Sequence, residues 1–313
     1  MLATNKGTYK PAKKPLKTRM YTYRWFYLMI VPVFIFVFLF NYLPMLGIRF
    51  AFYEYTPFKG PNFTGLDNFA KLISNNQFWT AFGNTWILSV GKLLVNNFAA
   101  VLLSLLINEV ANIHLKKFIQ TLVYLPHFLS WVVVASIFSI ILSPQSGFVN
   151  ELFMNLGLIE EPVYFLADTK SWRWVYFFVN IWKDTGWGTV IFLATLTGIN
   201  PELYEAARMD GATRIQQMRF ITLPALADTI IIVLILNLAK VMNLFESVLV
   251  MYNPKVYGVA DVLQTYVYRQ TLTTQVPNFG YSTAVGLFRS LVGCVLVLGC
   301  NWASKKARGR GII

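Results

Sequence analysis

The sequence predicts an all-α integral membrane protein, and three observations carry that prediction. First, 56% of the 313 residues are hydrophobic and only 13% are charged, whereas soluble domains average about 45–50% apolar and about 25% charged residues. Second, long apolar segments recur along the chain. Third, the basic excess, a formal net charge of +13, falls mainly in tails and connections, which is typical of membrane topology rather than of nucleic-acid binding.

Six apolar segments are each long enough to cross a bilayer as a helix, for which about 20 residues suffice. We predict spans at about residues 25–48, 84–108, 119–143, 173–199, 223–249 and 280–303. The first is longer than a secretory signal core and lacks a small-residue cleavage pattern, so we interpret it as a retained span. The predicted organisation is a six-span domain over residues 25–303, with basic tails at 1–24 and 304–313.

Lysine and arginine set the expected orientation. If the N-terminus is inside, the inner tails and connections carry more than twice as many Lys and Arg residues as the outer connections, as the positive-inside rule requires. We therefore expect both termini in the cytoplasm, with a flexible tail over 1–24. The outer stretches 63–74, with Asp67 as a cap, and 147–157 predict interfacial helices, which either form a rim for a docking partner or only anchor the bundle.

The polar connection at residues 200–224 predicts two short helices separated by a bend. Asn200 is a suitable N-cap, and Pro201 suits the first helical position because its missing N–H costs nothing there. Gly211 follows about three turns later, where a left-handed residue ends a helix at least cost. Thr213–Gln216 then has the pattern of a capping box for a second helix.

Charged side chains inside the predicted spans should face the bundle interior or water, because a charge facing lipid is costly. One face of the fourth span carries Asn180, Lys183, Asp184 and Trp187. A similar stripe on the fifth span, ending near Glu246, carries Asn237, Lys240, Asn243 and Ser247. Together the two stripes predict a polar cavity in the middle to outer half of the membrane.

Two interpretations of these stripes stay open. The side chains contact a solute, with Trp187 and its aromatic neighbours stacking on sugar rings, or they only neutralise one another. In the second case Lys183 pairs with Asp184, and Lys240 or Arg289 pairs with Glu246. Aromatic rings also anchor helices at membrane interfaces, so Trp187 alone does not decide between them.

Cysteine and histidine usage indicates no metal or redox chemistry. Cys294 and Cys300 lie six residues apart on different faces of one apolar segment, and we expect neither a disulfide nor a metal site. We interpret His114 and His127 as interfacial or satisfied helix residues. We expect no catalytic residue and no cofactor in this chain.

A nucleotide site is also not expected. Gly91-Lys92 resembles the end of a phosphate-binding loop, but Leu93 replaces the required Ser or Thr and the stretch lies inside a predicted span. The chain shows no paired-carboxylate site or Gly-rich dinucleotide turn either.

The connection at 200–224 resembles a known family. Glu205-Ala-Ala-Arg-Met-Asp-Gly-Ala212, followed by Ile221-Thr-Leu-Pro224, is similar to the EAA loop of ABC importer permease subunits. In that family the loop is a coupling helix that fits a groove on a separate ATPase subunit. The resemblance assigns this role to Glu205, Ala206, Ala207, Asp210 and Gly211. The alternative is an ordinary amphipathic connector with solvated charges.

Three later stretches resemble the carbohydrate branch of this family, which imports oligosaccharides and polysaccharide fragments: Asn253-Pro254, Ala260 to Arg269, and Tyr281 to Phe288. The resemblance implies a non-catalytic permease in a bacterial cytoplasmic membrane. Its implied partners are a second related permease, two ATPase subunits that bind ATP and magnesium, and an extracytoplasmic solute-binding protein.

Two other functions stay open. The same machinery carries non-sugar solutes such as peptides or polyamines in other members. A self-sufficient secondary carrier or channel is the third hypothesis, and it predicts internal repeats, a span broken at midplane, or a proton or sodium relay. The two halves of the sequence show no convincing repeat.

Overall fold

The computed structural model describes residues 15–308, in which almost all regular structure is helical. Two compact units are distinguished, one up to residue 50 and one from residue 51 onward. The exception to the predicted all-α class is a two-stranded antiparallel hairpin in the second unit, with Tyr53 opposite Phe63 and Glu54 opposite Asn62.

The first unit is a continuous helical path. After α1 (Leu16–Thr22), the helix α2 (Arg24–Val37) runs through a π turn, η1 (Phe38–Tyr42), into the 3-10 helix η2 (Leu43–Phe52), which ends in the second unit. Arg24–Phe52 is long and apolar enough to span a membrane and corresponds to the first predicted span. Residues 16–22 of the basic tail form α1, and residues 1–14 lie outside the described part of the chain.

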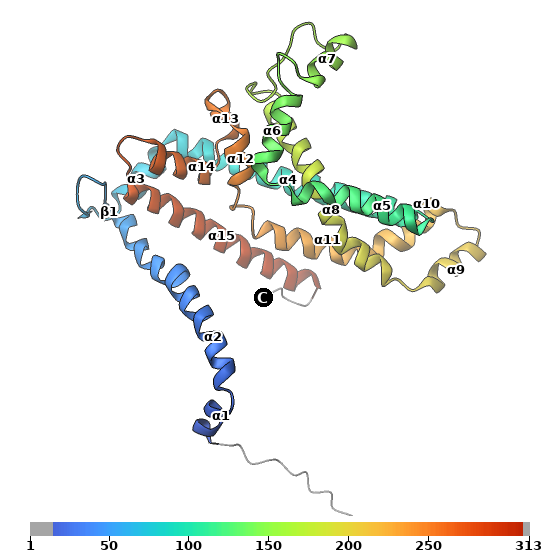
Figure 1. Ribbon diagram of the computed structural model, residues 1–313, viewed down its shortest axis with the longest axis horizontal. Coiled ribbons are helices and arrows are strands. Elements are labelled where there is room, and N and C mark those ends of the chain that lie inside the picture. Colours follow the sequence, from blue (N-terminus) through green and yellow to red (C-terminus); the bar gives the residue numbers. More distant parts are fainter. Residues whose placement is uncertain (1–14, 309–313) are drawn as a thin grey trace, which may run out of the picture. The chain divides into compact units, whose positions relative to one another are not determined.

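The second unit contains the hairpin and the remaining helices. In chain order they are β1 (Tyr53–Glu54), β2 (Asn62–Phe63), α3 (Asp67–Ser74), α4 (Asn76–Glu109), α5 (Ile113–Tyr124), η3 (Leu125–Phe128), α6 (Trp131–Ile141), α7 (Phe148–Asn155), α8 (Trp172–Thr197), α9 (Pro201–Met209), α10 (Arg214–Gln217), η4 (Met218–Thr222), α11 (Leu223–Leu238), α12 (Glu246–Met251), η5 (Pro254–Val256), α13 (Tyr257–Ala260), α14 (Leu263–Tyr268), η6 (Arg269–Thr273) and α15 (Phe279–Arg308). Figure 1 shows α9 and α10 beyond the ends of α5, α8 and α11, away from α3, α13 and α14.

Helices long and apolar enough to cross a membrane number four among residues 15–308: Arg24–Phe52, Asn76–Glu109, Arg214–Leu238 and Phe279–Lys306. They coincide with the first, second, fifth and sixth predicted segments. The third segment raises the number to five if its two bent parts are counted as one span. The fourth, α8, is about 39 Å long at 1.5 Å per residue, but it carries Arg173, Lys183 and Asp184 and is not among the four.

Two of the predicted spans are broken, which the hydropathy of the sequence did not predict. The third bends by 100° between η3 and α6. Pro126 lies in the turn before the bend, and Ser130 starts a new helix by accepting a hydrogen bond from the amide of Val133. The fifth, expected to continue to residue 249, ends as a helix at Leu238 and resumes only in α12.

Close packing between the helices depends on small residues. A Cβ added at Gly91 of α4 would lie 2.5 Å from the ring of Phe177 on α8, and one at Gly188 of α8 would lie 3.0 Å from Ala100. At Gly186 an added Cβ would lie 1.9 Å from the backbone oxygen of Val123, so α8 touches the main chain of α5 directly. Small residues allow such close backbone approach between membrane helices.

Hydrogen bonds connect the N-terminal half of α8 to α4 and to the segment that follows α11. Arg173 donates to Asn84 of α4 at 2.8 Å and to the backbone oxygen of Val259 at 3.2 Å. The Trp172 indole donates to the backbone oxygen of Met251 at 3.1 Å, and the hydroxyl groups of Tyr176 and Ser247 are 2.9 Å apart. These hydrogen bonds join α8 to α4 on one side and to α12 on the other.

Both predicted surface helices are present as α3 and α7. Asp67 is the first helical residue of α3 rather than its cap, since the preceding Leu66 occupies the cap position without a side-chain hydrogen bond.

At the start of α8, the hydroxyl and the amide N–H of Ser171 each donate to Asp168 at 2.8 Å. These hydrogen bonds lower the pKa of Asp168 because they stabilise its carboxylate form.

Candidate functional site

A cavity of about 600 Å³ opens among α4, η3, α8, the end of α11 and the chain between α11 and α12. This volume is within the range of about 300–1,000 Å³ typical of small-ligand pockets. Its polar and aromatic lining side chains are Ser89, Lys92, Asn96, Asn97, His127, Asp184, Trp187, Phe192, Asn237, Lys240 and Asn243. The structure thus brings parts of both predicted stripes to one cavity.

The carboxylate of Asp184 is shared between two basic groups on other elements. Its Oδ2 atom lies 3.4 Å from Nζ of Lys92 on α4, and its Oδ1 atom lies 3.2 Å from Nδ1 of His127 in η3. Both contacts are about one-quarter to one-third exposed, so water screens them only in part. The Lys183–Asp184 pair that we considered is therefore replaced by a link from Asp184 to α4 and η3.

Lys183 is buried beside the η3 turn and does not line the cavity. Its Nζ donates to the backbone oxygen of His127 at 2.8 Å and lies 5.4 Å from the centre of the Trp131 ring. Lys183 is only 4% exposed, and a buried ammonium needs such partners because burial removes its hydration. Its position indicates that it holds the η3 turn in place, and it does not line the cavity.

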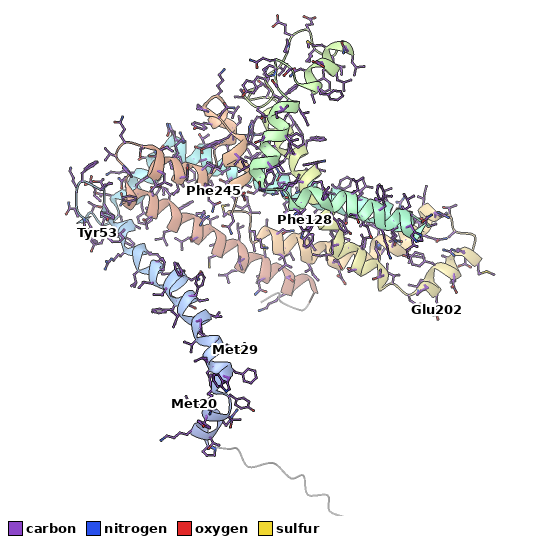
Figure 2. The ribbon with its side chains drawn as sticks, in the orientation of Figure 1. Met20, Met29, Tyr53, Phe128, Glu202 and Phe245 are labelled. Atoms are coloured by element: carbon purple, nitrogen blue, oxygen red, sulfur yellow. The ribbon has the colours of Figure 1, made fainter. Side chains whose placement is uncertain are left out.

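The rings of His127 and Trp187 are stacked at the cavity wall. Their centroids are 4.8 Å apart and their planes differ by 3°. Phe128 meets the edge of both rings; Figure 2 marks this residue at the end of the turn that joins α5 to α6. Trp187 keeps 50% of its surface exposed although His127 covers one face, so an aromatic surface remains open.

Three polar atoms on the α4 wall have no hydrogen-bond partner within the described chain. They are Oγ of Ser89, Oδ1 of Asn96 and Nδ2 of Asn97, and all three are buried. Buried polar atoms are nearly always hydrogen-bonded in folded proteins, to protein or to water. The α4 wall of the cavity therefore carries hydrogen-bonding groups whose capacity is not met by the described chain.

The fifth-span stripe does not lie on one helical face, because the helix ends at Leu238. Beyond it the chain turns tightly: the Lys240 amide donates to the oxygen of Asn237 at 3.0 Å, and the Asn243 amide donates to the oxygen of Lys240 at 2.8 Å. The three side chains still line the cavity. The prediction of a continuous helical stripe is wrong: three of its four residues line the cavity, and Ser247 instead contacts Tyr176.

Besides Lys183, two further predicted site residues do not line this cavity. Asn180 is fully buried and donates to the backbone oxygen of Tyr176 at 2.7 Å, one turn earlier in the same helix. Glu246 is exposed at the first turn of α12. Arg289, considered as its partner, instead donates to Oδ1 of Asn243 at 3.3 Å.

Sequence reasoning missed the positions of His127 and Lys92. We interpreted His127 as an interfacial or satisfied residue. For Lys92 we expected only, as for every charged side chain inside a span, that it faces the bundle interior or water, and we assigned it to neither stripe. The available signal was Lys92 itself, an ionisable residue within a span, which by default marks an interior or functional position. No local pattern pairs it with Asp184, which is more than ninety residues away in the chain.

The connection at 200–224 has the predicted local structure. Asn200 caps α9 by accepting a hydrogen bond from the Glu202 amide at 3.1 Å, with Pro201 as the first helical residue. Gly211 has a φ of +79°, and Thr213 and Gln216 form the capping box of α10. The chain therefore leaves α9, reverses at a left-handed glycine and starts again.

The surface of this connection is open. Glu205, Ala206, Asp210 and Gly211 are exposed and Ala207 is half-buried. Nothing lies within 4 Å of a Cβ built at Gly211. Apolar side chains are exposed around it, with Met209 at 88% and Ile215 at 76%.

A second cavity, of about 730 Å³, separates this connection from the end of α4. Glu205 and Arg208 of α9 line it, as do Glu109 and Arg214. Nη1 of Arg214 lies 3.8 Å from Oε2 of Glu109. This ion pair is largely exposed, and pairs of that kind contribute little to stability.

Comparison with known proteins gives a consistent family. The family described as binding-protein-dependent transport system inner membrane component matches residues 96–305. The chain is 41% identical over 293 residues to protein LplB of Bacillus subtilis (strain 168), covering 92% of this chain and 91% of that protein. It is 40% identical over 307 residues to the polygalacturonan/rhamnogalacturonan transport system permease protein YteP of the same organism, covering 97% and 94%.

Solved structures also match the fold of this chain. A crystal structure of a bacterial ABC transporter involved in the import of the acidic polysaccharide alginate contains a chain that matches with a TM-score of 0.84 and 38% identity, covering 94% of this chain and 99% of that one. A crystal structure of bacterial alginate ABC transporter in complex with alginate pentasaccharide-bound periplasmic protein matches with the same TM-score and 37% identity, covering 95% and 99%.

Proposed function

The chain belongs to the family of binding-protein-dependent transport system inner membrane components, and we propose that it forms half of the translocation pathway of an ATP-driven oligosaccharide importer. The observation that carries this proposal is the cavity of about 600 Å³. Its wall combines the open Trp187 ring, unpartnered polar atoms on α4 and charged side chains from three elements. Such a mixture suits a solute that has many hydroxyl groups and apolar ring faces.

The Trp187–His127 pair is the part of the cavity that favours a sugar. An aromatic face offers apolar contact to the C–H face of a sugar ring, while polar groups around it hydrogen-bond the hydroxyls. Relatives named for polygalacturonan/rhamnogalacturonan transport and for alginate import add support. Asn237, Lys240 and Asn243 across the same cavity supply hydrogen-bond donors.

The connection at 200–224 is the proposed contact with the ATPase. Glu205, Ala206, Ala207, Asp210 and Gly211 present a small, exposed surface on a bend of defined geometry. Docking there would let ATP binding by the ATPase move α9 and, through η4, the base of α11. ATP and magnesium belong to that partner in this proposal, and this chain hydrolyses nothing.

The proposed assembly contains a second related permease, two ATPase subunits and an extracytoplasmic solute-binding protein. A neighbour whose title describes a complex with a sugar-bound periplasmic protein supports the last of these partners. In this proposal six segments cross the membrane, with α5–η3–α6 as one bent span and α8 as a polar span facing the cavity. Both termini and the coupling connection lie in the cytoplasm, and α3, α7 and α13 lie outside.

The alternative function, a secondary carrier, was associated with a broken span, so the breaks in this structure need an explanation in a permease. A broken span was one of the features that we associated with that class, and the structure has breaks at residues 129–130 and 239–245. Both breaks lie beside the cavity, and a permease uses irregular backbone there for the same reason as a carrier, because it lines a water-accessible space.

Reconstitution tests the function. The chain is co-expressed with its second permease, ATPase and binding protein, and the complex is placed in proteoliposomes with ATP inside. We expect ATP-dependent uptake of an oligosaccharide that disappears when the binding protein is omitted. Uptake by this chain alone, driven by a proton or sodium gradient, would contradict the proposal and support a carrier.

A further inference from the structure

The lining of the main cavity carries unbalanced charge. Its basic side chains are Lys92, His127 and Lys240, and its one acidic side chain within the described chain is Asp184. Asp184 is already committed to Lys92 and His127. Lys240 forms no ion pair with any other residue between positions 15 and 308, so the cavity holds one basic group without a counterion.

The broken backbone after α11 presents Lys240 to the cavity. The turn formed by the hydrogen bonds of Lys240 with Asn237 and Asn243 places an amide side chain on each side of the lysine along the chain. All three side chains line the cavity, and Lys240 is exposed. These residues are spaced three apart, so a continued helix would also have placed them on one side; the turn that replaces the helix keeps all three at the cavity.

The side-chain amide of Asn243 has its N–H group, and not its oxygen, available to a ligand. Arg289 of α15 has only N–H donors, so the atom that it contacts at 3.3 Å is the amide oxygen, Oδ1 of Asn243. The amide nitrogen of Asn243 is then the group available to a ligand. Arg289 adds a second positive charge within hydrogen-bond distance of Asn243, so this side of the cavity offers donors and positive charge together.

The chemistry of these groups distinguishes an acidic ligand from a neutral one. Lys240 directly follows an apolar membrane helix, where an ionised side chain is costly without a partner. A sugar hydroxyl can accept a hydrogen bond from Lys240 but leaves its charge uncompensated. A carboxylate neutralises that charge, and charge-assisted hydrogen bonds are roughly twice as strong as neutral ones.

We propose that Lys240, with Asn243 beside it, forms a subsite for the carboxylate of an acidic oligosaccharide, and that Lys240 selects uronic acid residues over neutral sugars. The sugar ring then has the open face of Trp187 in the same cavity. This inference rests on the proposed function and adds to it a substrate class and a specificity-determining residue.

The test compares a matched pair of ligands and a matched set of variants. The complete importer in proteoliposomes is given saturating binding protein, and uptake is measured for an oligogalacturonate and for its carboxyl-reduced counterpart, which has the same length and linkage. The variants are Lys240→Gln, Lys240→Arg and Lys255→Gln. The last removes a lysine charge from exposed η5, away from the cavity.

We expect Lys240→Gln to lower uptake of the acidic ligand by about tenfold, which corresponds to about 1.4 kcal/mol, and to leave uptake of the neutral ligand within about twofold of wild type, a difference of about 0.4 kcal/mol. Lys240→Arg and Lys255→Gln should keep the wild-type preference. If the binding protein admits only the acidic ligand, loss in the Gln variant with retention in the Arg variant supports the subsite.

Three results would overturn the subsite. They are equal loss of both ligands in Lys240→Gln, wild-type uptake of the acidic ligand by that variant, and import of only the neutral ligand by the wild type. In each of these cases the importer function stands. Uptake of neither sugar by the wild type would instead remove the proposed function, and the subsite with it.

Discussion

The Nζ atom of Lys183 donates a hydrogen bond of 2.8 Å to the backbone oxygen of His127. This contact ties the middle of α8 to η3, just before the chain bends by 100° into α6. Because Lys183 is buried and His127 faces the cavity, the bond connects the packing of the helices with the shape of the cavity wall.

Replacing Lys183 with Met tests this link. The substitution keeps the aliphatic length but leaves a carbonyl group without its donor, at a cost of about 1–3 kcal/mol if that group stays buried. We expect a lower thermal midpoint of the purified complex and impaired uptake, both improved in Lys183→Arg. If Lys183 acts on uptake through His127, Lys183→Met should cause no further loss of uptake in a His127→Ala background. Independent, additive losses would contradict that role.

Trp187 is predicted to contact the solute. Trp187→Ala removes the open aromatic face and should lower uptake by about tenfold, equivalent to about 1.4 kcal/mol, while the complex still co-purifies. Trp187→Phe should retain most of the uptake because a ring remains. Trp182→Ala is the matched control, since Trp182 lies on the same helix but packs against Phe138 and does not line the cavity. Wild-type uptake by Trp187→Ala would remove α8 from the pathway.

Gly186 should tolerate no side chain. A Cβ there would lie 1.9 Å from the oxygen of Val123, a backbone atom that cannot rotate away. Gly186→Ala should therefore destabilise the complex by about 1–3 kcal/mol, as overpacking does. Gly293→Ala in α15, where nothing lies within 4 Å, is the control. Equal thermal midpoints for the two variants would show that α8 and α5 are not packed so closely.

ATP hydrolysis should require the partner subunit. The sequence has no phosphate-binding loop. Gly91, part of the false motif, lies within α4 and packs against the ring of Phe177 on α8. The purified chain alone should show no vanadate-sensitive hydrolysis, and activity should appear when the ATPase is added. Hydrolysis by the chain alone that survives removal of contaminants would refute this expectation.

Local signals in the sequence predicted the local structure of the connection at 200–224 well. Asn200, Pro201, Gly211 and the pair Thr213–Gln216 act within one or two turns of the chain, so their structural consequences follow from residue type and spacing. The left-handed φ of Gly211 and the complete capping box have the expected form.

Long-range features were harder to predict. Hydropathy identifies apolar length but does not show where a helix breaks, so the end of α11 at Leu238 and the bend before Trp131 were missed. The neighbours of Asp184 also come from distant parts of the chain. Lys183 is adjacent to it in sequence, but neighbouring residues in a helix point in different directions, and Lys92 takes the place of Lys183 as partner.

The central claim, that residues 205–211 couple this chain to an ATPase, is tested most directly by Gly211→Val and Glu205→Ala. With φ at +79°, Gly211→Val should cost about 1–2 kcal/mol of backbone strain and add bulk to the docking surface. Gly157→Val is the matched control, because Gly157 has a φ of +67° and equally open surroundings but lies after α7.

The decisive measurement is the stoichiometry of the ATPase that co-purifies with each variant, taken beside uptake in the same membranes. The account predicts that Gly211→Val inserts normally but loses the ATPase, that Glu205→Ala retains part of it and uncouples hydrolysis from uptake, and that Gly157→Val keeps both. A full complement of ATPase with normal sugar uptake in Gly211→Val would contradict it.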